Sequence, residues 1–435
     1  MAGEAYKFDA LGAIAAIKAR RIAVSDYAGA LISHIEANEP AIQAWQHFEP
    51  EQVRAQAAAL DACADLSRLP LAGVAVGVKD IIDTAGMPTE NGTVLDAGRG
   101  PQTDAAVVRA LREAGAVIMG KTVTTELAFM HPARTRNPRN LEHSPGGSSS
   151  GSAAAVAAGM VPIALGTQTA GSVIRPAAFC GVYGLKPTHG LFSREGVLEE
   201  AGSLDVVGVF ARTLGDAAAV GQVLAKGAGS ASGDYLAATR ESAFPARFAF
   251  VRTPSWPLAE EDTKAAFESF AKALGPICET LDLPASFDRA IGFHRTVMFS
   301  EMALNYTGYY ERGKDQLSTE LREAIEAGRQ MLAVDYAQAL RERESLYQQL
   351  LGTLEPYDAI ITPSAPGPAP KGFKTTGNPV FCSMWTYLGV PALNLPLLEV
   401  NGLPLGVQLV GRRSGEERPF KAAAAFLQAA TARCI

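Results

Sequence analysis

Cysteine is scarce in this sequence, and no two cysteines have the spacing of a metal or redox motif. There are five among 435 residues, an odd number, and they are scattered along the chain: Cys63, Cys180, Cys278, Cys382 and Cys434. A disulfide framework or a zinc knuckle needs paired or closely spaced cysteines, so this pattern argues against both. The pattern fits a reducing compartment, and we expect a cytoplasmic protein.

Basic patches and long apolar segments are also missing. The net charge is -6 and no run of Lys and Arg stands out, which argues against a nucleic-acid partner. No segment is apolar for long enough to cross a bilayer, so we expect no membrane partner. The N-terminal stretch MAGEAYKFDALGAIAAIKARRIAV carries charges throughout and lacks a signal-peptide core, which indicates an amphipathic helix. No His, Asp and Glu set has metal-ligand spacing, so we expect neither metal nor cofactor.

Hydrophobic periodicity in the first part of the chain predicts helices followed by paired strands. Apolar positions recur at helical spacing over residues 9–38 and 50–64. The Val/Ile/Gly run at 71–83 is typical of a buried strand, and a helix at 104–115 and a second strand at 116–120 follow it. A strand, helix, strand order implies a crossover connection and a parallel strand pair.

The second half is expected to be helical and then to return to strands. Residues 260–354 are mostly helical in pattern, and short apolar runs near the C-terminus precede a terminal helix. No repeat and no long linker divides the chain. With a hydrophobic content of 48%, the sequence therefore predicts one large α/β domain over residues 1–435.

Residues 115–122, GAVIMGKT, match the phosphate-loop pattern GxxxxGK[ST]. A phosphate loop needs a strand before it and a helix after it. Here a helix precedes the match, and its interior, 116–119, is itself an apolar strand. We therefore keep nucleotide binding only as a disfavoured alternative.

Residues 147–151, GSSSG, match the nucleophile elbow GxSxG with Ser149 at its centre. That motif requires a hydrophobic strand directly before it, but the preceding residues are NPRNLEHSPG. The histidines that follow, His189 and His294, are isolated in the sequence. An α/β-hydrolase triad is therefore a second disfavoured alternative.

Three separated segments form a third pattern when they are taken together. They are Lys79 at the end of LAGVAVGVK, the loop PGGSSSGS at 145–152, and GTQTAGSVIRPAAFCGVYGLKPT at 166–188. In these segments the chain resembles the amidase-signature family. The resemblance covers most of the chain, is strongest from 71 to 188, and is closest to the malonamidases of that family.

The resemblance implies a fold and a division of the chain. It implies an α/β amidase-signature fold, with a mixed, largely parallel twisted sheet covered by helices on both faces. The expected sections are an N-terminal helical segment (1–65), the signature core (66–215), a mostly helical, substrate-selective region (216–355) and a C-terminal return to the sheet (356–435). It also suggests a homodimer.

The resemblance implies a Ser, cis-Ser, Lys triad, in which Ser172 is the nucleophile, Ser148 the relay and Lys79 the base. Lysine acts as a base only when neutral, which burial in an apolar strand end favours. A hydroxyl both donates and accepts, so Ser148 is suited to relay a proton between the other two groups. The expected products are a carboxylic acid and ammonia or an amine, formed through an acyl-enzyme.

The turn around Ser172 is a candidate oxyanion hole, because consecutive backbone N–H groups are fixed before the reaction starts. The expected donors are the N–H groups of Thr169, Ala170, Gly171 and Ser172. The common family form of this turn is TDTGGS. Gln168 here replaces Asp and Ala170 replaces Gly, which keeps the donors but changes the turn.

Substrate binding is assigned to Arg175 and Gly147. A guanidinium is suited to hold a carboxylate through two hydrogen bonds, as the resemblance to malonamidases implies. The alternative is that Arg175 stabilises the turn as a buried structural residue. The first expected substrate is thus a small amide bearing a free carboxylate, and the second is an uncharged aliphatic or aryl amide. A role within a tRNA-dependent amidotransferase is less favoured.

Overall fold

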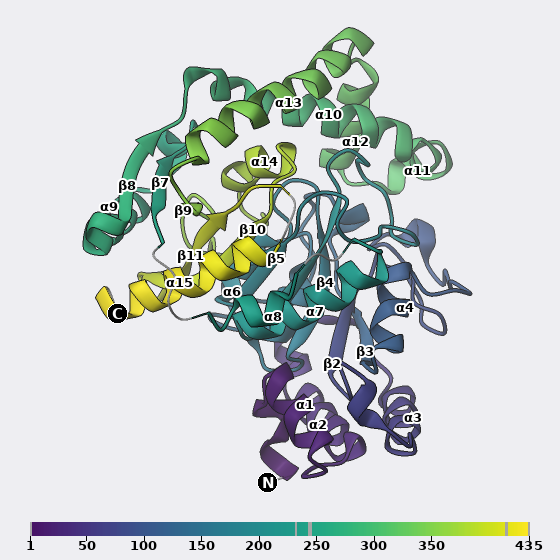
Figure 1. The fold of residues 1–435 in the computed structure, drawn as a ribbon. Helices are drawn as coiled ribbons and strands as arrows, with labels where there is room; N and C mark the ends of the chain where they lie inside the picture. The colour runs from purple at the N-terminus through teal and green to yellow at the C-terminus, as the bar shows by residue number, and fades with distance from the viewer. Residues whose placement is uncertain (1, 231–232, 242–245, 414–415, 434–435) are drawn as a thin grey trace.

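The computed structural model describes residues 2–230, 233–241, 246–413 and 416–433. In these ranges the strands form one sheet with helices on both faces (Figure 1). The sheet order is β1-β3-β2-β4-β6-β5-β10-β11-β9-β7-β8. The strands are β1 (Trp45–His47), β2 (Ala75–Lys79), β3 (Val117–Thr122), β4 (Ile163–Gln168), β5 (Tyr183–Lys186), β6 (Val206–Ala211), β7 (Phe248–Arg252), β8 (Cys278–Asp282), β9 (Ala359–Pro363), β10 (Ala392–Val400) and β11 (Leu403–Val410).

Along the chain, helices come before, between and after these strands. They are α1 (Ala10–Lys18), α2 (Val24–Ile42), α3 (Pro50–Asp61), α4 (Ala106–Glu113), α5 (Ser150–Ala157), α6 (Ile174–Cys180), α7 (Leu214–Gly227), α8 (Tyr235–Ala238), α9 (Glu261–Leu274), α10 (Ala290–Asn305), α11 (Thr307–Gly313), α12 (Thr319–Arg329), α13 (Ala333–Leu354), α14 (Val380–Tyr387) and α15 (Glu417–Arg433). None of these helices, within the described ranges, is both long and apolar enough to cross a membrane.

The sheet is mixed, as the sequence predicts. Strand β2 runs parallel to β3 and β4, and β7 runs parallel to β8 and β9. The strands between these two groups pair in antiparallel fashion, including the β10–β11 hairpin. Parallel pairing is therefore less extensive than expected, because β5, β6 and the hairpin separate the two parallel groups.

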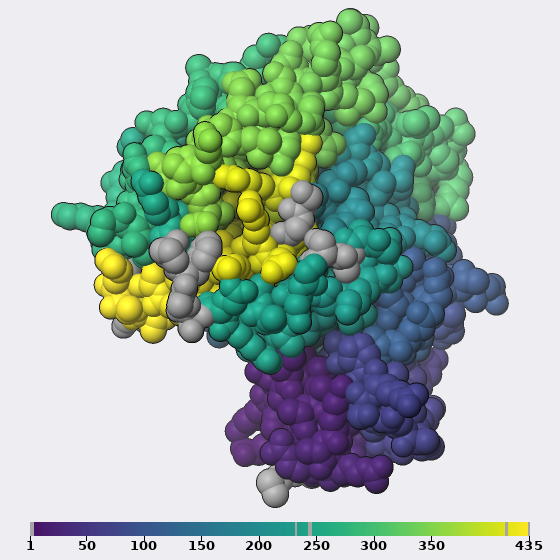
Figure 2. Space-filling model, viewed as in Figure 1, coloured from purple at the N-terminus to yellow at the C-terminus, as the bar shows by residue number. Residues whose placement is uncertain are grey.

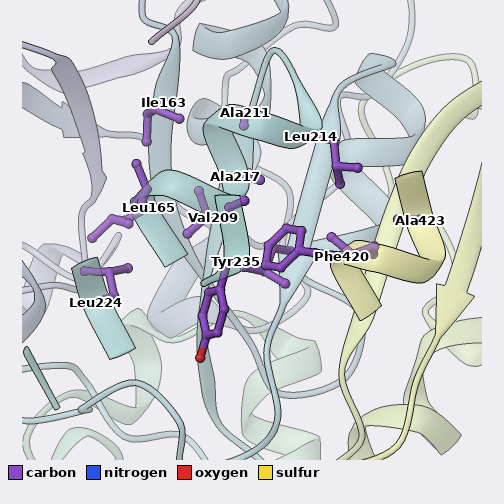
Figure 3. Close-up of a cluster of buried hydrophobic side chains, with 14 of the residues drawn as sticks. Ile163, Leu165, Val209, Ala211, Leu214, Ala217, Leu224, Tyr235, Phe420 and Ala423 are labelled. Carbon is purple, nitrogen blue, oxygen red and sulfur yellow. The ribbon is translucent and has the colours of Figure 1, made fainter. Parts of the chain in front are cut away.

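Alternating side chains along the strands build a separate core on each face of the sheet. On one face, Val76 and Val78 of β2 belong to a cluster that includes residues of α4, α7, α8 and α15. Figure 3 shows the part of this cluster where Tyr235 lies beside Phe420. On the other face, Ala75 belongs to a cluster with α1, α2 and the alanines of α5. Ala75, Gly77 and Lys79 of β2 therefore lie on the face of the sheet that α5 covers.

The N-terminal helices form a lobe that projects from the rest of the molecule, at the bottom of Figure 1 and Figure 2. The helical pattern over 9–38 corresponds to two helices, α1 and α2, and Arg20 between them has a positive φ of 53°. Asp9 caps α1 by accepting a hydrogen bond from the Gly12 N–H at 2.6 Å. The helix predicted at 50–64 is α3, and the strands predicted at 71–83 and 116–120 are β2 and β3.

The region 216–355 is mostly helical, and α10 to α13 lie together at the top of Figure 1. It also contributes β7 and β8 to the sheet, which the sequence pattern did not predict. Strand β8 is an edge strand, and most of its residues are exposed, so no apolar run marks it. All four expected sections thus contribute strands to one sheet, while the division itself stays a prediction.

Candidate active site

Lys79 ends β2 and is fully buried. Its Nζ donates hydrogen bonds to Ser148 Oγ at 2.7 Å and to Thr167 Oγ1 at 2.8 Å. Burial lowers the pKa of Lys79 to about 7, although the nearby carboxyl groups of Glu200 and Asp205 act in the opposite direction. A large share of the Lys79 amines is therefore neutral near pH 7, as a base requires.

The loop that carries Ser148 is a buried, tightly packed segment rather than a linker. The peptide bond between Gly147 and Ser148 is cis, and Gly146 before it has a φ of 83° that favours glycine. Ser150 Oγ donates to the Gly146 carbonyl at 2.8 Å, and α5 begins at that serine. At Gly151 the backbone passes so close to the Ala44 carbonyl that an added Cβ would lie 2.2 Å from its oxygen.

The turn between β4 and α6 is held by the Gln168 side chain. Gln168 Oε1 accepts hydrogen bonds from the N–H groups of Val173 and Ile174, at 2.8 and 3.0 Å. Its Nε2 donates to Thr386 Oγ1 at 2.9 Å, and that hydroxyl lies 2.8 Å from the Ala170 carbonyl oxygen. The glutamine that departs from the common family form thus organises this turn. Thr386 was not predicted, because it lies 218 residues away in α14.

Ser172 lies in this turn, two residues before α6, and its exposed fraction is 9%. In the described part of the chain, the N–H groups of Ala170, Gly171 and Ser172 donate to no protein acceptor. Backbone donors that are held in place and left unpaired are what an oxyanion hole requires. On the opposite side of the turn, the buried His294 of α10 lies 2.9 Å from the Thr169 carbonyl oxygen through its Nε2.

The structure joins Lys79 to Ser148 directly, but it does not join Ser148 to Ser172 by a hydrogen bond among the described residues. Catalytic hydrogen bonds are often long in the absence of substrate and shorten when it binds. Of the two contacts that the expected relay needs, the structure thus shows the one between Lys79 and Ser148.

Arg175 is buried and binds backbone carbonyl groups. Its Nη1 donates to the Gly377 carbonyl at 2.5 Å, and its Nη2 donates to the Gly147 carbonyl at 2.6 Å and to Thr376 Oγ1 at 3.3 Å. Burial lowers the pKa of Arg175 to about 10, so the guanidinium stays charged near neutral pH. Arg175 therefore ties the loop before Ser148 to the segment at 376–377. Gly147, the other expected substrate-binding residue, is its partner through the carbonyl group.

Neither disfavoured motif has the surroundings that its chemistry needs. Residues 117–122 of the phosphate-loop match form strand β3, and Lys121 is buried with its Nζ 2.6 Å from the Ile82 carbonyl and 3.8 Å from Asp80. Ser149 is buried, and its Oγ lies 3.3 Å from both the N and the O of Thr167. His189 and His294 each contact a backbone carbonyl instead of a serine.

Lys121→Ala should destabilise the protein rather than remove a nucleotide site. The substitution leaves the buried Asp80 carboxyl without its cationic neighbour, which typically costs about 3–5 kcal/mol of unfolding free energy. Urea denaturation measures this loss, and Lys272→Ala, at an exposed position on α9, should stay within about 0.5 kcal/mol. ATP that stabilises the native chain but not Lys121→Ala would contradict our rejection of the phosphate loop.

Within the described ranges, the cysteines and potential metal ligands give no sign of a second active centre. Cys63, Cys180 and Cys382 have free thiols, and Cys434 lies outside the described residues. Burial raises the pKa of Cys180 to about 12, which keeps it a thiol. No group of three His, Cys, Asp or Glu in the described ranges is arranged to hold a metal ion.

Comparison with known proteins places this site in a family. A profile of the Amidase family matches residues 26–419. The chain is 33% identical to a glutamyl-tRNA(Gln) amidotransferase subunit of Symbiobacterium thermophilum, with 94% of each chain covered, and 34% identical to that of Halalkalibacterium halodurans, also with 94% covered. These relatives are amidotransferase subunits, so they support the family and not the narrower resemblance to malonamidases.

Solved structures agree with this assignment. Peptide amidase from Stenotrophomonas maltophilia superposes with a TM-score of 0.84 at 28% identity, covering 98% of each chain. A 6-aminohexanoate cyclic dimer hydrolase, in complex with substrate, gives 0.84 at 25% identity, covering 98% of this chain and 97% of that one. The chain therefore belongs to the amidase family, has the amidase-signature fold, and is a hydrolase acting on amide C–N bonds.

Proposed function

We propose that the chain hydrolyses small amides through a Ser172, Ser148, Lys79 triad. The observation that carries this proposal is the 2.7 Å hydrogen bond from Lys79 to Ser148 in a site where burial lowers the lysine pKa. Neutral Lys79 accepts a proton from Ser148, and Ser148 in turn accepts the proton of Ser172 as Ser172 attacks the amide carbonyl. The unpaired N–H groups of the 170–172 turn stabilise the oxyanion.

The second half of the reaction reverses the path of the proton. Lys79, now protonated, returns the proton through Ser148 to the leaving nitrogen, so ammonia or an amine departs and an acyl-enzyme ester on Ser172 remains. Water then attacks the ester, with the same groups removing its proton, and releases the carboxylic acid. Each step uses the Lys79 to Ser148 contact, and no step needs a cofactor.

The contacts of Arg175 bear on the choice of substrate. They support a role for Arg175 in stabilising the turn over a role in binding a substrate carboxylate. Two of its nitrogens already donate to carbonyl groups within the protein. We therefore place uncharged aliphatic or aryl amides ahead of amides bearing a carboxylate. The resemblance to malonamidases supports the carboxylate-bearing class, which stays the alternative.

A screen of ammonia release separates the two substrate classes. Matched amides with and without a free carboxylate are offered to the native chain and to Arg175→Lys. Lysine keeps the charge but loses the forked geometry that binds the two carbonyls, so we expect all amides to lose kcat by a similar factor, about tenfold or more. A rise in KM for the carboxylate-bearing amides alone would instead indicate that Arg175 binds the carboxylate of the substrate.

The amidotransferase relatives favour a second candidate, in which the chain is one component of a larger enzyme. Its support is 33 to 34% identity over nearly the whole chain. Rapid amide hydrolysis by the purified chain alone argues for the stand-alone amidase, whereas activity that requires a partner protein argues for the second candidate. A homodimer and a cytoplasmic location stay predictions from the sequence.

A further inference from the structure

Two buried carboxyl groups lie on either side of the Thr169 hydroxyl, behind the turn that carries Ser172. Thr169 Oγ1 is 2.9 Å from Glu200 Oε2 and 2.6 Å from Asp205 Oδ1. All three side chains are almost fully buried. They also border a small cavity together with Thr167, the second hydrogen-bond partner of Lys79.

The number of protons in this cluster follows from its geometry. A hydroxyl group has one proton, so Thr169 can donate to only one carboxyl oxygen. An ionised carboxylate only accepts, so the second short contact is a hydrogen bond only if that carboxyl group carries a proton and donates it to Thr169. Two ionised carboxylates in this buried position would also repel each other strongly.

The backbone indicates which carboxyl group is ionised. Asp205 Oδ2 accepts hydrogen bonds from the N–H groups of Glu200 and Ala201, at 2.8 and 3.0 Å, and lies 3.9 Å from Arg194. These contacts favour the charged form of Asp205. In the described structure, the Glu200 carboxyl group has a single hydrogen bond, its contact with Thr169. Burial and the adjacent Asp205 raise the pKa of Glu200.

The other titratable groups facing this pair come from β2, from α10 and from the loop between β5 and β6. Lys79 of β2 interacts electrostatically with both carboxyl groups. At the end of α10, the Tyr306 hydroxyl donates to the Leu127 carbonyl, and burial raises the pKa of this tyrosine. His294 of α10 contacts the Thr169 carbonyl, and burial lowers its pKa to about 4, so it is neutral near pH 7. Arg194, in the loop between β5 and β6, lies near Asp205 and also pairs with the exposed Glu199.

We propose that Glu200 is a positioning residue that is protonated in the resting enzyme, and that it acts through a Glu200 to Thr169 to Asp205 hydrogen-bond chain. The chain holds the first residue of the 169–172 turn. The protonated state also leaves one negative charge near Lys79 instead of two. When Glu200 loses its proton, the chain breaks and a second charge stabilises protonated Lys79, which then cannot act as the base. The inference rests on the proposed roles of Lys79 and Ser172.

The pH dependence of kcat in Glu200→Gln and Glu200→Ala tests the proposal. Glutamine donates an N–H to Thr169 Oγ1 and does not ionise, so Glu200→Gln should stay within about threefold of the native kcat at pH 7 and lose the alkaline decline that Glu200 causes. Glu200→Ala removes the donor and should lower kcat about tenfold or more with little change in KM. An equal loss of kcat in both variants, or an unmoved alkaline limb in Glu200→Gln, would overturn the proposal.

Infrared difference spectroscopy gives a readout that does not depend on turnover. The native protein at pH 7 should show the carbonyl band of a buried protonated carboxyl group, and Glu200→Gln should lack it. Absence of that band from the native protein would contradict the proton assignment. Failure of the triad and failure of the Glu200 assignment give different results. If the triad were wrong, Ser172→Ala would keep activity while the native protein still showed the band.

Discussion

Ser172→Ala should remove amide hydrolysis almost completely, with kcat reduced by about 10⁴- to 10⁶-fold. The variant keeps the 170–172 N–H groups and the Lys79 to Ser148 contact, but it lacks the oxygen that forms the acyl-enzyme. Because Ser172 Oγ makes no hydrogen bond within the described residues, its removal should leave the midpoint of thermal unfolding nearly unchanged. Steady-state ammonia release and a melting curve measure the two effects.

Ser149→Ala is the matched control, since Ser149 is the serine that the elbow motif would make the nucleophile. Among the described residues, its Oγ forms hydrogen bonds only with the backbone of Thr167, at the long distance of 3.3 Å. We expect a loss of about 1 kcal/mol of stability and a kcat within about tenfold of the native value. If Ser149→Ala were inactive and Ser172→Ala active, the assignment of the nucleophile would be reversed.

Replacement of Lys79 should produce the second large effect. Lys79→Met fills the same buried space without a base, and we expect kcat to fall by about 10²- to 10⁴-fold or more. Lys79→Arg should fail as well, because arginine stays protonated at every working pH. In the native enzyme, kcat should rise with pH through about 7 as Lys79 loses its proton, and residual activity in Lys79→Met should lack this rise.

Lys186→Met controls for the loss of a buried lysine as such. Lys186 of β5 is fully buried, burial lowers its pKa to about 7, and its Nζ donates to the Pro187 carbonyl rather than to the site. This variant should keep both substantial activity and the acid limb of the pH profile. Loss of that limb in Lys186→Met but not in Lys79→Met would show that another group is the base.

The sequence was sufficient to predict those features of the fold and the site that depend on the local pattern of residues. The apolar run before Lys79 predicted a buried strand, and that burial is the physical cause of the lowered lysine pKa. The helix preceding 116–120 was sufficient to reject the phosphate loop, whose residues form β3. The mixed α/β sheet was predicted as well.

The supports of the site could not be predicted, because they depend on contacts between distant segments. Gln168 is visible in the sequence as a departure from the family form, but its role depends on Thr386 in another helix. The chain from Glu200 to Asp205 requires a buried hydroxyl placed between two carboxyl groups that look like ordinary surface residues in the sequence. The sequence leaves two roles open for Arg175, and it does not show that the side chain donates to the carbonyl groups of Gly147 and Gly377, which lie far from it in the chain.

Trapping of the acyl-enzyme tests the central claim most directly. The native chain is quenched with acid during turnover of an amide or the matching ester, and peptide mapping by mass spectrometry locates the acyl group. We predict a single adduct on the peptide containing Ser172, with the acyl group on that residue, and none in Ser172→Ala. An acyl group on Ser148 or Ser149, or turnover without any adduct even when hydroxylamine is supplied to intercept it, would contradict the account.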